Sequence, residues 1–541
     1  MKKLIAGFSI TFFFVASMVF LSTSLVMAQN VTDTLPKHWH ESGGFGTSTS
    51  GGLGGTVYKV TNLNNSGPGS FRDAVSGDNR LVVFEVGGVI DLNNSDIELG
   101  SNITIAGQTA PSPGITLIRA NLSANGDHTV VSHITMMLGD NTTGEKDVAN
   151  IRGNYVVFDH VTTAWSIDEN LSIHGVDNVT LYKCIIAEGL QYAGHVDGEH
   201  SKGSLINGSP TNLSLIGCLY AHNAMRNPRC DRGEIFIANQ VNYNWTTGWD
   251  EPDPQWFNYV VCTYFADVTF VGNVALQGPE SIGEIYLDGY NSASNIPSLS
   301  NAYINDNIIL DQEGNDLQIY DPDEHVLLDT PPLWPGGFEA MPAHESLYEN
   351  LRTVGSRPGN RDVHNSRIVL TVANGDGEVI DSQDEVGGYP DYAGTSHSLV
   401  VPDGTEARQE WLDSLEDEIA VDTFVDLSRL YTMVGSQASD KFRSYSGGIS
   451  STLHGNYSSR VSSDGIVAYP NPVSSQLQVA LGYEFSESPI IQLFDYTGRM
   501  VLSIKSAGIE NSINMGSLPP GLYIIKVSSG MKCIVQSIVK K

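Results

Sequence analysis

Three cationic residues lie close together in a chain that is otherwise strongly acidic. Lys202 follows His200 by two positions, and Arg226 and Arg229 flank a single Asn-Pro pair. The formal net charge of the chain is −32. Arginine binds a carboxylate as a planar fork, whereas lysine acts as a point charge. Cations concentrated in such a protein therefore predict a site for a negatively charged ligand.

A pattern of apolar, polar and apolar residues must position these side chains. It recurs through the middle of the chain at intervals of roughly 20 to 35 residues, as in Val130–Ile134 and Val157–Val161. We align its polar positions as His133, His160, Cys184, Cys218, Gln240, Asn273 and Asn307. Short strands at such a period are typical of a solenoid, whose coils bury their apolar faces by stacking.

The pattern predicts a right-handed parallel β-helix from about residue 54 to residue 400. The aligned polar side chains should then form an internal ladder, with positions 160, 184 and 218 on successive coils. This makes His133 and His160 structural rather than catalytic. A β-sandwich is the alternative, but its strands are joined by tight hairpin turns at short intervals, and the connections here are long and irregular. The 55 glycines and 23 prolines also favour turns and short strands.

The rest of the chain divides into shorter segments. Residues 401–435 are predicted to pack on the solenoid as a helix or loop within a domain spanning 29–435. Residues 436–464 are rich in Ser and Gly and predict a linker. Residues 465–541 alternate apolar and polar residues, which indicates a small antiparallel β-sandwich.

The N-terminus has the features of a targeting segment. Lys2 and Lys3 precede an apolar run that continues to about Val26, and Ala28 follows shortly after it. This predicts a secretory signal peptide over residues 1–28. The run is also long enough for a retained membrane anchor, which is the alternative.

Cysteines and overall charge exclude some kinds of site. No Cys-X-X-Cys pair is present, which argues against a zinc site. Because a secreted location permits disulfides, two interpretations of the first four cysteines stay open: buried free thiols, or one disulfide among them. A pI of about 4.6 argues against nucleic acid, which needs a basic face. We expect a monomer.

Several motifs carry a resemblance to known families. The glycine-rich segment 51–55, the segments 66–74 and 102–111, and the segments around Trp165, Lys202 and Arg226 resemble polysaccharide lyase family one, the pectate lyases. This likeness covers about residues 43–390. The motifs Tyr469–Pro472 and Leu518–Tyr523 and the basic C-terminus resemble the C-terminal sorting domain of type IX secretion. That likeness implies export across the outer membrane to the medium or cell surface; a carbohydrate-binding module is the alternative.

The pectate lyase resemblance implies cleavage of polygalacturonate by β-elimination. An enzyme of this kind must neutralise the uronate carboxylate and supply a base for the neighbouring proton. The residues implied are Arg226 as the base, with an alkaline optimum, Lys202, Arg229, Arg232 and His200 for substrate, and Asp147 and Asp168 for Ca²⁺. Glu169, beside Asp168, is predicted as a further Ca²⁺ ligand. The family often has a further Asp four residues after the position of Asp168, where this chain has Ser172.

Other functions remain open at this point. A polygalacturonase-type hydrolase would need paired carboxylates as acid and base. A non-catalytic polysaccharide-binding protein would use the aromatic stretch from Tyr243 to Trp256. A lyase for methylated pectin or another uronate is a nearer alternative.

Overall fold

The computed structural model describes most of the chain after residue 33. The described residues are 34–142, 144–246, 259–282, 285–289, 300–320, 325–422, 425–427, 429–430, 433, 466–469, 475–481, 489–495, 500–506, 510–519, 521–529 and 532–540. The predicted signal peptide and the predicted linker lie outside them.

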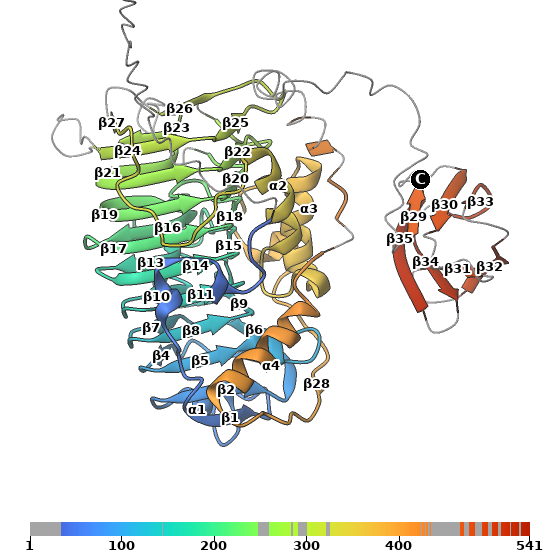
Figure 1. Ribbon diagram of the computed structural model, residues 1–541, viewed down its shortest axis with the longest axis horizontal. Coiled ribbons are helices and arrows are strands. Elements are labelled where there is room, and N and C mark those ends of the chain that lie inside the picture. Colours follow the sequence, from blue (N-terminus) through green and yellow to red (C-terminus); the bar gives the residue numbers. More distant parts are fainter. Residues whose placement is uncertain are drawn as a thin grey trace, which may run out of the picture.

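The described residues between 56 and 327 form a right-handed parallel β-helix, which confirms the predicted fold class (Figure 1). Each full coil contributes one strand to each of three parallel columns. Column A contains β1 (Thr56–Val60), β2 (Arg80–Phe84), β5 (Ile103–Ala106), β8 (Thr129–Ser132), β11 (Val157–Asp159), β14 (Asp177–Tyr182), β17 (Thr211–Ile216), β24 (Ser300–Asn305) and β27 (His325–Leu327). Column B contains β4 (Ile97–Leu99), β7 (Leu122–Ala124), β10 (Ala149–Ile151), β13 (Glu169–His174), β16 (Lys202–Asn207), β23 (Ile285–Gly289) and β26 (Gln318–Tyr320).

Two long strands, β19 (Arg229–Ala238) and β21 (Tyr259–Val271), pair with both columns and join them into one sheet. Column C is a separate sheet. It contains β3 (Val86–Asp91), β6 (Ile115–Ile118), β9 (Ile134–Met137), β12 (Thr162–Ala164), β15 (Ile185–Ala187), β18 (Leu219–Ala221), β20 (Val241–Tyr243), β22 (Val274–Leu276), β25 (Ile308–Leu310) and the antiparallel β28 (Thr395–Ser396).

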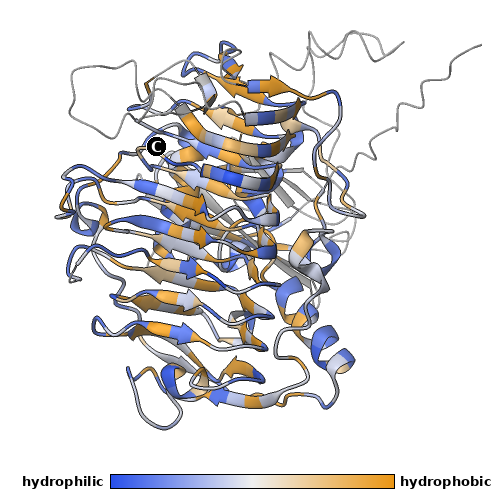
Figure 2. Ribbon diagram, turned by 90° about the vertical axis from the view of Figure 1, so that its left-hand side faces the viewer, coloured by the Kyte–Doolittle hydropathy of each residue, from blue (hydrophilic) through white to orange (hydrophobic). Residues whose placement is uncertain are grey.

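Stacking explains why such short strands are stable. Val157 pairs with Val130 on the preceding coil and with Thr180 on the following one. Most strand residues are buried, and their inward side chains form one continuous apolar core along the stack. Hydrophilic residues gather in turns and on the covering helices, while apolar residues follow the strands (Figure 2).

The predicted ladder is wrong by one residue at its start. Asp159 pairs with Tyr182 and Thr162 with Ile185, so Val161, not His160, lies opposite Cys184. The inward column is Ile134, Val161, Cys184, Cys218, Gln240, Asn273 and Asn307, in which Asn273 Nδ2 donates to Asn307 Oδ1 over 2.9 Å. His133 and His160 occupy the preceding corner position, where their φ values of 58° and 50° turn the chain and aim the side chains out of the core.

The coils end at β27, earlier than the predicted residue 400, and the chain then returns along the outside of the stack. Helices α2 (Ala343–Thr353) and α3 (Val363–Asn374) cover column C through Leu347, Leu351 and Ile368. Helix α4 (Thr405–Asp417) packs Leu412 against the first coils, which confirms the predicted covering segment. The short helix α1 (Phe71–Ala74) buries Phe71 at the beginning of the stack.

The covering segments also contain short 3-10 helices: η1 (Trp39–Glu41), η2 (Phe45–Ser48), η5 (Pro358–Asn360) and η6 (Gln383–Val386). A further one, η3 (Gly107–Thr109), lies within a coil between β5 and β6. Four cysteines, Cys184, Cys218, Cys230 and Cys262, are buried free thiols, so the disulfide alternative fails for them. Within the described ranges, no helix combines the length and apolar character that crossing a membrane requires.

The C-terminal residues form two antiparallel sheets around their own apolar core. One sheet contains β29 (Ile466–Tyr469), β30 (Gln476–Leu481) and β33 (Glu510–Asn514). The other contains β31 (Ile490–Asp495), β32 (Met500–Lys505), β34 (Gly521–Ser529) and β35 (Lys532–Lys540). This matches the predicted small sandwich.

Candidate active site

Coil stacking brings the predicted site residues to the same edge of column B. Asp147 lies two residues before β10, Glu169 begins β13 and Lys202 begins β16. Glu169 pairs directly with Lys202, and Lys202 forms a bridge with Met225, beside Arg226. Residues far apart in sequence thus become neighbours because each coil begins its column B strand at this edge.

The three predicted metal ligands converge. Ligand atoms of Asp147, Asp168 and Glu169 all lie within 4.8 Å of one another. The amide of Glu169 also donates to Asp147 Oδ1 over 3.1 Å. Burial and the neighbouring charge of Asp168 raise the pKa of Asp147 to about 7, although a hydrogen bond from Ser172 opposes that rise. Such crowding of carboxylates is the arrangement that a cation relieves.

Asp168 also faces the cationic side of the site. His200 Nε2 lies 2.7 Å from Asp168 Oδ1 and contacts Lys202 Nζ. Burial works against ionisation of Asp168, but His200 and the positive Lys202 outweigh it and hold its pKa below the ordinary value. Burial lowers the pKa of Lys202 to about 8.

Arg226 lies beside these carboxylates and follows Met225, which pairs with Lys202. Its guanidinium forms an ion pair with Glu169, and its side chain keeps 18% exposure whereas Glu169 keeps 3%. Burial and the charge of Arg229 lower the pKa of Arg226. Its backbone has φ 59°, an uncommon conformation for a residue other than glycine.

A set of buried amides holds the Arg226 turn in place. Asn170 Nδ2 donates to Asn223 Oδ1 over 2.9 Å, and Asn223 Nδ2 donates to Asn227 Oδ1 over 3.1 Å. Asn242 donates to the Asn227 carbonyl over 2.6 Å. No sequence pattern predicts this role for the asparagines, since asparagine is common in turns.

The two remaining arginines differ from the prediction in their surroundings. Arg229 makes a two-pronged ion pair with Asp231, with both N–O distances at 2.8 Å. Arg232 is exposed, and its guanidinium carbon lies 5.6 Å from the ring centroid of Tyr264. Among the described residues, no hydrogen bond or ion pair links Arg232 to the three carboxylates, so its role stays a prediction.

A further histidine was missed. His195, in the loop between β15 and β16, stacks on His200 with ring centroids 3.5 Å apart, and its Nε2 lies 3.8 Å from Asp168 Oδ1. Asp168, His195 and His200 therefore form a second group able to hold a metal. The alternation of His195, Asp197, Glu199 and His200 in this loop was the available signal.

The aromatic stretch that a polysaccharide-binding protein would use is mostly unsuited to that role. Tyr243 and Trp245 are each 2% exposed, and Trp245 Nε1 donates to the carbonyl of Ile282. Trp249 and Trp256 lie outside the described residues. The edge of column B instead combines a carboxylate group with Lys202 and Arg226, which suits recognition of an anionic substrate and proton transfer.

Comparison with known proteins supplies two independent likenesses. A family model described as a secretion system C-terminal sorting domain matches residues 467–541. A protein named probable pectate lyase C from Neosartorya fischeri is 41% identical over 229 residues, which are 41% of this chain and 52% of that protein. Another of the same name from Emericella nidulans is 30% identical over 412 residues, which are 74% of this chain and 93% of that protein.

Coverage varies among these relatives. The chain spans about half the length of the first curated relatives that it matches. Among solved structures, the match to a Bacillus subtilis pectate lyase covers 62% of this chain and 99% of that chain, at 13% identity and a TM-score of 0.43.

Proposed function

Since this chain belongs to the pectate lyase family, we propose that it cleaves polygalacturonate by β-elimination. In that reaction the C5–H and C4–O bonds of a uronate residue break, and a C4–C5 double bond forms. The proton passes to a base, and the C4 oxygen leaves with the departing chain and takes a proton from solvent. The observation that supports this most is the position of Arg226. Its partly exposed side chain lies beside the three carboxylates of Asp147, Asp168 and Glu169, and its neighbour Met225 pairs with Lys202.

Arg226 is proposed as the base because its side chain is partly exposed and its guanidinium lies beside the carboxylate of Glu169. Lys202, held by His200, is proposed to bind a substrate carboxylate and thereby make the neighbouring C5 proton more acidic. Arg229 is proposed to assist, with Asp231 fixing the plane of its guanidinium. The buried amides around Asn227 keep Arg226 oriented while substrate is bound.

Asp147, Asp168 and Glu169 fit a calcium ion, since calcium takes oxygen ligands and tolerates irregular geometry. Bound there, calcium would neutralise the uronate carboxylate. Glu169 also pairs with Arg226, so its carboxylate would be shared between the cation and the base.

The test measures the initial rate of formation of unsaturated product by ultraviolet absorbance. Polygalacturonate with added calcium should be cleaved, chelator should abolish the rate and fresh calcium should restore it. A chelator-insensitive rate on methylated pectin with none on polygalacturonate would instead support the alternative lyase. Release of reducing ends without any double bond would contradict β-elimination and support a hydrolase.

The sorting-domain match points to secretion by the type IX system. We propose that residues 1–28 are removed as a signal peptide, that residues 29–435 form the lyase domain and that residues 465–541 direct export after a linker. The partners proposed are thus the acidic polysaccharide and the secretion machinery.

A further inference from the structure

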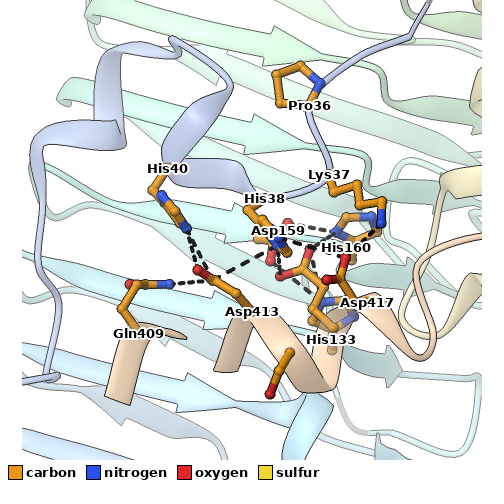
Figure 3. A network of polar contacts seen from close by, with 12 residues as sticks. Pro36, Lys37, His38, His40, His133, Asp159, His160, Gln409, Asp413 and Asp417 are labelled. Carbon is orange, nitrogen blue, oxygen red and sulfur yellow. Dashed lines mark hydrogen bonds and ion pairs between the residues drawn. The ribbon is translucent and has the colours of Figure 1, made fainter. Parts of the chain in front are cut away.

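Another group of ionisable side chains lies where α4 crosses the corners of the coils, away from column B. Its members are His133, Asp159, His160 and Glu416, whose ligand atoms all lie within 4.8 Å of one another. Exposure is 0% for His133 and Asp159, 1% for His160 and 2% for Glu416. Figure 3 shows the two histidines and Asp159 together beside α4.

Three side chains of this group, His133, Asp159 and Glu416, each use one polar atom in a contact with a neighbour that fixes their orientation. His133 Nδ1 lies 2.7 Å from the carbonyl of Ser356, which can only accept, so Nδ1 carries the proton. His160 Nδ1 lies 2.7 Å from Asp159 Oδ1. His38 Nδ1 lies 3.2 Å from Glu416 Oε2. Neighbours thus orient both carboxylates, and His133 Nε2 faces them.

The other atoms of these three side chains face one another without hydrogen bonds. Among the described residues, His133 Nε2, Asp159 Oδ2 and Glu416 Oε1 have no hydrogen-bond partner. His133 Nε2 lies 3.7 Å from both oxygens, which is too far for a hydrogen bond. Leaving three buried polar atoms unpaired is costly, so something between them is expected to satisfy all three.

We propose that His133 Nε2, Asp159 Oδ2 and Glu416 Oε1 bind a divalent transition-metal ion of the zinc type. Zinc bonds to nitrogen and oxygen of roughly 2.0–2.2 Å place tetrahedral ligands about 3.4 Å apart, close to the 3.7 Å separations here. One doubly charged ion also balances two buried carboxylates. Calcium takes six to eight oxygen ligands, so it suits Asp147, Asp168 and Glu169 at the edge of column B better than this group.

The surrounding contacts have the form expected around metal ligands. A ligating histidine usually donates its other N–H to a carbonyl or carboxylate, as His133 does to Ser356. His160 holds Asp159 in the same manner, and its ring stacks on His133 with centroids 4.7 Å apart. A zinc ion here needs no Cys-X-X-Cys pair, because its ligands are one histidine and two carboxylates.

The ion would connect parts of the chain that are distant in sequence. Glu416 comes from α4, while His133 directly follows β8 and Asp159 ends β11 on the next coil. The site is therefore inferred to be structural, fastening the returning helix to the stack, and it does not depend on the proposed lyase activity.

The test uses the untagged full chain, with bound metal measured by mass spectrometry. Parent protein is expected to hold about one equivalent of zinc per chain, and metal-free protein should take up zinc with a rise in Tm. Cobalt(II) substitution should give the visible absorption of a four-coordinate ion. His133→Gln and Glu416→Gln should each lose the bound metal and the rise in Tm.

Matched variants separate this site from others. Asp413→Asn alters α4 one turn earlier, where Asp413 pairs with His40, and should keep the metal. His222→Gln removes a buried histidine that bonds Thr371 and Asn244, and should also keep it. Asp168→Asn should keep zinc while altering calcium dependence. Metal lost in Asp413→Asn but retained in His133→Gln, or parent protein that neither contains nor binds zinc, would overturn the proposal.

Discussion

At the scale of residues, the site depends on opposite charges held close together at one edge. Arg226 and Lys202 are largely buried beside carboxylates that would be solvated in an ordinary acidic surface. The position of each charged atom therefore matters more than the number of charges. Two substitutions distinguish the base from a metal ligand.

Arg226→Lys should reduce the lyase rate by about 100-fold or more, since a general base contributes about that much. Lysine keeps the positive charge, but its flexible stem cannot present the planar guanidinium at the same place. The initial rate of double-bond formation measures the effect, and circular dichroism checks the fold. Arg80→Lys, at the start of the stack, serves as the control. A rate near that of the parent would exclude Arg226 as the base.

Asp168→Asn should act through calcium. We expect the calcium concentration for half-maximal rate to rise by about tenfold or more, with much of the rate recovered at saturating calcium. Asp197→Asn changes an exposed carboxylate of the neighbouring loop and should leave that concentration unchanged. Equal calcium curves for Asp168→Asn and the parent would remove Asp168 from the proposed ligands.

At the scale of elements, α3 is fastened to the coils by a buried ion pair. Arg367 on α3 binds both carboxylate oxygens of Glu188, and Trp165 Nε1 donates to Glu188 Oε2 over 2.9 Å. Burial by itself would raise the pKa of Glu188, but the pairing with Arg367 outweighs it and lowers the pKa. Glu188 therefore favours the folded state most when ionised.

Glu188→Gln should destabilise the protein by about 3–5 kcal/mol at neutral pH, because it leaves Arg367 partly buried without its partner. The folded pKa lies below the unfolded value of 4.5, so this stabilisation is present above pH 4.5 and is lost as the pH falls through the folded pKa. The free energy of unfolding, measured with denaturant from pH 7 down to pH 3, should fall less for the variant than for the parent protein. Glu85→Gln, in a surface pair with Lys59, should cost no more than about 1 kcal/mol.

At the scale of the whole molecule, the coil stack and the C-terminal sheets have separate apolar cores. Separate cores are typical of units that fold independently. The C-terminal unit can therefore serve export without taking part in the chemistry of column B.

Deletion from Gly465 onward should leave the lyase activity and Tm of the purified protein unchanged while blocking its release. In a bacterium with a type IX system, the truncated chain should accumulate inside the cell envelope and the full chain in the medium or at the surface. Fractionation followed by immunoblotting measures this. Normal release of the truncated chain would contradict an export role for residues 465–541.

The sequence by itself determined the fold class and named candidate site residues, whose roles stay predictions. The apolar repeat is satisfied by stacking, and the motifs around Trp165, Lys202 and Arg226 indicated the proposed chemistry through their resemblance to a known family. Asp147 and Asp168 could be named because their segments resemble a family, and Glu169 because it adjoins Asp168; coil stacking brings all three together.

Only the tertiary structure decided which side of a corner each residue occupies. His133 and His160 were predicted as ladder residues because the repeat can be aligned in two registers that differ by one residue. The apolar pattern alone does not distinguish these registers. The pairing of the coils places Ile134 and Val161 inside and aims both histidines outward. Their partner Glu416 lies on a helix that no local pattern connects to these coils, since the contact depends on the path of the returning chain across the stack.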